Sequence, residues 1–151
     1  MGIGRRLETD DVSLERMNTR KLTRAAVEVA PDGSQIRRLL AVRGGSCAHC
    51  TLYPGDTSKA MRHRSVEEIW FVLRGRGQLW RKRGKAEQVV DLATGLCASI
   101  PTGVHFQVRN TGQEILEFIL CTMPPWPGAV EAVRVPDHWP EAGRPKRRRG
   151  R

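Results

Sequence analysis

"EEIWFVLRGRGQLWRKRGKAEQVVDLATGLCASIPTGVHFQVRNTG", residues 67–112, decides the fold class. Short apolar runs of strand length alternate here with Gly, Pro and Asn turn signals, as in EEIWFVL before RGRG and LCASI before PTG. The same pattern begins near Ala25 and continues to Met123, with no capped run long enough for a typical helix. Regularly spaced short strands without helices predict an all-β sandwich or barrel.

A chain of 151 residues has the typical size of one domain. After the barrel the chain becomes rich in proline, which excludes a central strand. Trp126 and Trp139 in this part are too large and apolar for a free linker, so we expect them to cover the barrel or to pack against a second subunit. We predict four segments: a flexible N-terminal arm (1–24), the barrel (25–123), a Pro/Trp-rich covering segment (124–143) and a disordered basic tail (144–151).

The formal net charge of +10 is concentrated in the tail, because residues 144–151 hold six basic residues and no acid. Such a tail can contact nucleic-acid phosphates without sequence specificity, and a merely solvated terminus is the alternative. No stretch is apolar for long enough to cross a bilayer, and the N-terminus lacks the apolar region of a secretory signal. Four cysteines in such a chain predict reduced thiols and a cytoplasmic protein.

The stretch "SCAHC", residues 46–50, contains a C-x-x-C pair around a histidine. In a strand, successive side chains point to opposite faces, so Cys47 and His49 share one face and Cys50 lies on the other. The two cysteines would be about 10 Å apart, beyond the roughly 7 Å that a disulfide spans. We interpret the pair as a coincidence of packing, and Cys97 and Cys121 as buried apolar side chains.

Two segments, 54–77 and 95–112, resemble the two motifs of the cupin superfamily. The first motif, G-x5-H-x-H-x3-4-E-x6-G, is matched by Gly55, His63, Glu68 and Gly75, with Met61 in place of the first histidine. The second, G-x5-P-x-G-x2-H-x3-N, is matched by Gly95, Pro101, Gly103 and Asn110, with Phe106 in place of the histidine and His105 one residue early.

The resemblance covers roughly residues 27–122. It implies a single small jelly-roll barrel (a double-stranded β-helix of the conserved-barrel type 2 kind), often dimeric, with a site inside the barrel mouth.

In this family, imidazoles and a carboxylate converge on a divalent metal such as Fe, Mn, Ni or Zn. The resemblance therefore implies His63 and Glu68 as ligands, and register favours Glu68 over Glu67. A β-bulge could turn His105 inward, and His49 could replace the ligand lost at Met61. The expected ligand set is His49, His63, Glu68 and His105, and the cavity or substrate candidates are Met61, Trp70, Phe106 and Gln107.

Three functions are compatible with these residues. The leading hypothesis is a small-molecule-binding cupin with a divalent metal, whose family chemistry would be that of an oxygenase, isomerase or lyase. The second is a metal-free binding or regulatory module, which Met61 and Phe106 favour. The third is nucleic-acid binding through the tail. A homodimer is expected from the resemblance and from the tryptophan-bearing segment, and no catalytic residue is assigned.

Overall fold

The computed structural model describes residue 14 and residues 16–24 and 27–140. The basic tail predicted at 144–151 and most of the predicted N-terminal arm lie outside the described residues. The strands are β1 (Glu28–Val29), β2 (Gln35–Val42), β3 (Gly45–Leu52), β4 (Met61–His63), β5 (Glu67–Arg74), β6 (Gly77–Arg83), β7 (Ala86–Leu92), β8 (Cys97–Ile100), β9 (His105–Asn110), β10 (Leu116–Met123) and β11 (Ala132–Arg134).

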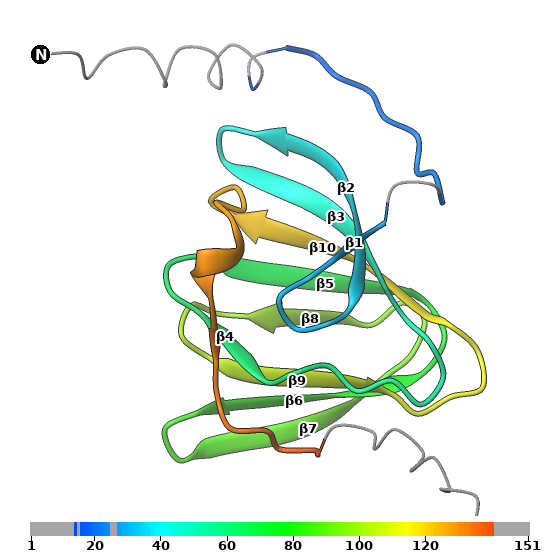
Figure 1. Cartoon of the computed structure of the whole chain (residues 1–151), viewed down its shortest axis with the longest axis vertical. Helices are drawn as coiled ribbons and strands as arrows, with labels where there is room; N and C mark the ends of the chain where they lie inside the picture. The colour runs from blue at the N-terminus through cyan, green and yellow to red at the C-terminus, as the bar shows by residue number, and fades with distance from the viewer. Residues whose placement is uncertain (1–13, 15, 25–26, 141–151) are drawn as a thin grey trace, which may run out of the picture.

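Two antiparallel sheets pack face to face (Figure 1). Sheet A has the strand order β1-β2-β3-β10-β5-β8, and sheet B has the order β11-β4-β9-β6-β7. The prediction of an all-β jelly-roll barrel is therefore confirmed. None of the helices among the described residues has the length and apolarity needed to span a bilayer.

The core lies between the sheets because each strand alternates apolar and polar positions. In β5, Glu68, Trp70 and Val72 are buried, whereas the residues between them are exposed. Trp70 stacks on Phe118 of β10 with ring centroids 4.5 Å apart, and its ring meets Phe106 of β9 edge-on at 5.7 Å. Offset and edge-on contacts are the favoured aromatic geometries, so these three rings fix the spacing of the sheets around the site.

Gly75 of the first motif and Asn110 of the second hold turns of the barrel. Gly75 has φ of +87°, and a Cβ there would lie 2.5 Å from the carbonyl oxygen of Ile115. Only glycine avoids both the left-handed strain and the clash. The Asn110 amide donates to the carbonyl oxygens of Leu52 (3.0 Å) and Glu114 (2.7 Å). These two residues explain why part of the motif is structural.

The segment after Met123 crosses one end of the barrel from sheet A to sheet B, as the orange-to-red ribbon of Figure 1 shows. It contains a 3-10 turn, η1 (Ala129–Glu131), and then β11, which pairs with β4 at the edge of sheet B. The sequence analysis predicted no regular element here. A short strand forms because residues 128–135 contain no proline, and an edge position tolerates the prolines on either side.

Candidate functional site

A partly open cavity of about 490 Å³ is lined by both sheets, by the C-terminal segment and by Leu14, Asn18 and Arg20 of the N-terminal arm. Its inner wall is apolar and aromatic, and its polar side chains come from neighbouring strands because inward positions recur every second residue. Site-forming residues include Cys50, His63, Glu68, Trp70, Phe106 and Thr122. Trp126 of the C-terminal segment closes part of the opening.

Glu68 and His63 are in contact inside this cavity. The Glu68 Oε1 atom lies 3.3 Å from His63 Nε2, and the two side chains are only 6% and 4% exposed. The Trp70 indole N–H donates to Glu68 Oε2 at 2.9 Å, which fixes the carboxyl group. The His63 ring is held edge-on by Phe106 at 5.0 Å and by Trp126 at 5.3 Å. These contacts set the positions of both side chains, which are buried in the wall of the cavity.

Burial shifts the pKa values of this pair in opposite directions. It raises the pKa of Glu68 from 4.5 to about 7, although the hydrogen bond from Trp70 works against that rise. It lowers the pKa of His63 from 6.5 to about 4, although the charge of Glu131 opposes the change. In the folded protein near neutral pH, His63 is therefore neutral and Glu68 exchanges its proton.

Two buried polar atoms at this cavity are unsatisfied. His63 Nδ1 and Thr122 Oγ1 have no hydrogen-bond partner among the described residues. Thr122 lies directly opposite Glu68 in the pairing of β10 with β5, and Glu68 contacts His63. Thr122 Oγ1 and His63 Nδ1 therefore border the same polar end of the cavity. The sequence analysis missed Thr122, although the inward series of β10 (Leu116, Phe118, Leu120, Thr122) carries the signal.

His49 lies on the outer face of sheet A. Its neighbours Cys50 and Leu52 belong to the core, and its own side chain is opposite Arg37, with the Arg37 Nη1 atom 3.5 Å from His49 Nδ1. The predicted alternation, with His49 and Cys50 on opposite faces, therefore holds. It places His49 away from the cavity.

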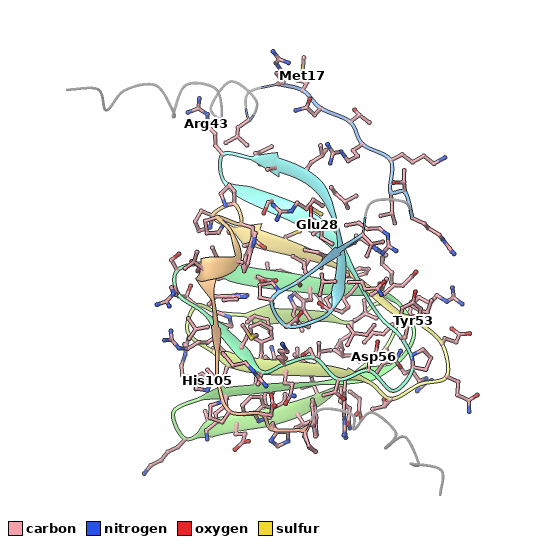
Figure 2. The ribbon with its side chains drawn as sticks, viewed as in Figure 1. Met17, Glu28, Arg43, Tyr53, Asp56 and His105 are labelled. Carbon is pink, nitrogen blue, oxygen red and sulfur yellow. The ribbon has the colours of Figure 1, made fainter. Side chains whose placement is uncertain are left out.

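His105 also points away from the cavity, and Phe106 occupies the inward position. The pairing of β9 with β6 runs without a register shift from His105 to Asn110, so the bulge that would turn His105 inward does not form. Figure 2 shows His105 at the periphery, where β9 begins. A strand without a bulge can present only every second residue to the interior.

Gln107 shares the outer face of β9 with His105, and its amide anchors the C-terminal segment. Its Nε2 donates to the carbonyl oxygens of Ser58 (2.8 Å) and Trp139 (2.9 Å), and its Oε1 accepts from the backbone N–H groups of His138 (2.9 Å) and Trp139 (2.8 Å). The sequence made Gln107 a candidate for contact with the cavity or the substrate. In the structure, both the nitrogen and the oxygen of the Gln107 amide bond to the C-terminal segment.

The side chains at the motif positions do not fit a divalent metal held by three or four protein ligands. His63 and Glu68 offer two donors, whereas Met61 offers a soft thioether and Phe106 offers none. In the part of the chain that the structure describes, no group of three or more His, Cys, Asp or Glu side chains is arranged to hold a metal ion. The ligand set expected from the resemblance is not brought together.

Comparison with known proteins agrees with this fold. A family profile described as "Cupin domain" matches residues 48–123, about half of the chain. The chain is 29% identical to Uncharacterized protein MJ1618 of Methanocaldococcus jannaschii over 103 residues, 65% of this chain and 79% of that protein.

Two solved structures resemble the barrel. A Cupin 2 conserved barrel domain protein from Salinispora arenicola is 24% identical with a TM-score of 0.58, covering 71% of this chain and 88% of that one. A predicted oxalate decarboxylase from Thermotoga maritima is 22% identical with a TM-score of 0.53, covering 60% of this chain and 80% of that one. At these identities the likeness shows the fold. With the domain match, it means that the chain belongs to the cupin superfamily.

Proposed function

We propose that the barrel binds a small oxygen-bearing organic molecule whose polar group meets His63, Glu68 and Thr122. The observation that carries the proposal is the pair of buried, unpartnered atoms at one end of the cavity, His63 Nδ1 and Thr122 Oγ1. Buried polar atoms are normally hydrogen-bonded, and leaving one unsatisfied costs about 1–3 kcal/mol. A ligand hydroxyl, carbonyl or carboxyl group would supply the missing partners.

The remainder of the cavity supports a ligand with an apolar part. Trp70, Phe106 and Phe118 form the wall beside Glu68, and the volume of about 490 Å³ is typical of small-molecule sites. Arg20 is among the residues that line the cavity and would favour an anionic ligand, whereas Arg38, which also lines it, is paired with Glu28 at 2.9 Å. Small carboxylic acids are therefore the first class to screen, and the similarity to a predicted oxalate decarboxylase makes oxalate one of them.

A catalytic role is the second candidate, and the pKa of Glu68 favours it. A carboxyl group with a pKa of about 7 is suited to give and take a proton at neutral pH. Neutral His63, 3.3 Å away, is a hydrogen-bonding partner that would orient the carboxyl group and the reacting atom. Proton-transfer chemistry of the isomerase or lyase kind would use these two groups as proton donor, proton acceptor and positioning partner.

Ligand binding is tested by calorimetric titration of hits from a screen of small organic acids and hydroxy compounds. Glu68→Gln keeps the shape but removes the titrating proton, and we expect affinity to fall at least tenfold. Glu67→Gln is the matched control, because Glu67 is the preceding residue in β5 and is exposed. Hits that bind both variants as tightly as the natural chain would place the site elsewhere.

Metal content tests the same site independently. Cupin domains often hold a divalent metal, and the sequence predicts Fe, Mn, Ni or Zn. Because the described residues contain no group of three or more His, Cys, Asp or Glu side chains arranged to hold a metal ion, we expect far less than one equivalent of these metals in protein purified without chelators. Elemental analysis decides the matter. One equivalent that disappears in His63→Ala would show that a metal completes the site and that our donor count is wrong.

The proposed partners are a small-molecule ligand and a second copy of the chain. The outer face of sheet A supports the homodimer, because Ile69, Phe71 and Leu73 of β5 are each at least 40% exposed. A contiguous exposed apolar surface of this kind is typical of an interface. Nucleic-acid binding through residues 144–151 and a cytoplasmic location stay predictions from the sequence.

A further inference from the structure

Two cysteines far apart in the sequence meet on the outer face of sheet A. Cys47 of β3 is directly opposite Cys121 of β10 in their antiparallel pairing. Leu120 packs against the core and Thr122 lines the cavity, so Cys121 between them points outward. Directly opposed residues on one face have Cβ atoms about 4.5–5.5 Å apart. The two thiols therefore contact each other outside the barrel.

A methionine extends this pair. The Cγ atom of Met123 lies 3.3 Å from the position that a Cβ on Gly45 would take, on the face that Gly45 shares with Cys47. Met123 follows Cys121 by two residues in β10 and therefore shares its face. The absence of a side chain at Gly45 gives the methionine room to lie beside the cysteines. One thioether and two thiols thus gather on neighbouring strands.

These sulfur-bearing residues line a groove of about 380 Å³ that adjoins the barrel cavity, because Cys47 and Thr122 line both. Leu40 and Val42 of β2 form its other wall. Cys47, Cys121 and Met123 are all half-buried, so the groove is accessible but largely apolar. Of the side chains that line the groove, none is charged. The chemistry offered to a ligand is therefore that of soft sulfur.

Both cysteines are free thiols, and the pKa of Cys47 is raised to about 11 by burial and by the neighbouring Cys121. A thiol of this kind is a poor nucleophile at neutral pH. A metal ion can nevertheless displace its proton, and thiolate and thioether ligands select soft ions such as Cu(I) over the hard divalent ions.

We propose that Cys47, Cys121 and Met123 form a surface site for a soft, thiophilic metal ion on the outer face of sheet A, beside the ligand cavity. Binding releases the two thiol protons and leaves the ion coordinated by two thiolates and one thioether. This proposal does not depend on the function of the barrel cavity.

The test is an oxygen-free titration with Cu(I) in competition with a chromophoric Cu(I) chelator. We expect one tight equivalent per chain, with ultraviolet thiolate-to-metal absorption. Cys47→Ser and Cys121→Ser should each remove that equivalent, and Met123→Leu should weaken binding at least tenfold. Cys97→Ser is the matched control, because Cys97 is exposed on β8 of the same sheet and outside the groove.

Melting curves of the variants without metal separate loss of the site from loss of the fold. Repeating the titration on Phe71→Glu tests whether the site belongs to one chain, and we expect one equivalent there as well. An unchanged copper equivalent in Cys121→Ser, or loss of it in Cys97→Ser, would overturn the assignment.

Discussion

Glu68 and His63 exchange the protonation states that they have in an unfolded chain. Between pH 4.5 and 6.5 the unfolded chain carries an ionised carboxylate and an imidazolium, whereas the folded pair is a neutral carboxyl and a neutral imidazole. Each state holds one proton on the two groups. Because stability depends on pH only through the difference in bound protons, the contributions of the two residues cancel in this range.

Substituting either residue alone should reveal the pH dependence of stability that the other residue cancels in the natural chain. In Glu68→Gln only His63 remains, and because its folded pKa is about 4, unfolding takes up a proton below pH 6.5. Stability should then rise with pH from about 4 to 6.5, by about 3 kcal/mol relative to the natural chain. In His63→Asn only Glu68 remains, with a folded pKa of about 7, so stability should fall as pH rises from 4.5 to 7.

Denaturant unfolding at several pH values measures both slopes. Glu67→Gln serves as the control because Glu67 is exposed and lies outside the cavity. Slopes of the same sign in Glu68→Gln and His63→Asn would contradict the proton balance.

For single residues, the sequence predicted the positions that follow from the alternation of side chains along one strand. It did not predict the positions that depend on how a strand pairs with its neighbours. The opposite faces of Cys47 and Cys50, and the choice of Glu68 over Glu67, follow from the two-residue period of a strand, and the structure agrees. His105 could not be placed, because a bulge depends on pairing with a neighbouring strand. Cys97 was interpreted as buried and is exposed, since a short apolar run does not show which of its faces is covered.

The C-terminal segment is the element that completes the mouth of the barrel. Glu131 accepts hydrogen bonds from the backbone N–H groups of Ser65 and Val66, the latter at 2.7 Å, and from the Ser65 hydroxyl. Burial would raise the pKa of Glu131, but these hydrogen bonds outweigh it and lower the pKa below its ordinary value. The loop that joins β4 to β5, between His63 and Glu68, is therefore held by a residue from the cover.

Removing this carboxylate should loosen the mouth. We expect Glu131→Ala to destabilise the fold by about 2–3 kcal/mol, because it leaves buried N–H donors without an acceptor. Glu114→Ala is the matched control, since Glu114 is exposed and pairs with exposed Arg74. Chemical denaturation measures the loss. A loss of stability no larger than that of Glu114→Ala would mean that water satisfies these N–H groups as well as Glu131 does.

The sequence predicted that Trp126 and Trp139 belong to a cover, but it gave no indication of how the cover attaches. Trp126 contacts His63, and Trp139 packs in a second small cluster with Ala60, Trp80 and Val135. The attachment depends on Gln107 and Glu131, whose partners are 31 or more residues away in the chain. No local pattern marks such pairs.

At the scale of the whole molecule, sheet A presents an apolar outer face to the surroundings. Ile69, Phe71 and Leu73 project from β5, a strand with neighbours on both sides in sheet A, so they cannot be covered by a further strand of the same sheet. A second copy of the chain offers an identical apolar face, and a two-fold axis would bury both.

Phe71→Glu should therefore convert the proposed dimer to a monomer, because each copy would place a charge in a desolvated contact. Light scattering after gel filtration measures the mass. Val89→Glu is the matched control: Val89 is 43% exposed, close to the 46% of Phe71, but lies in β7 of the other sheet. A dimer that persists in Phe71→Glu, or that is lost in Val89→Glu, would place the contact elsewhere.

The pairing of β4 with β11 has a consequence for the order of events during synthesis. His63 stands on β4, which shares one paired position with β9 and three with β11. Strands β1 to β10 leave the ribosome before β11 does, so the emerging chain can close its core while the strand that carries His63 still lacks a partner on one side. A ribosome that stops after Met123 would release a chain with β1 to β10 complete and an unfinished pocket. Completion of the proposed binding pocket would therefore wait for β11, which follows every other strand in the chain.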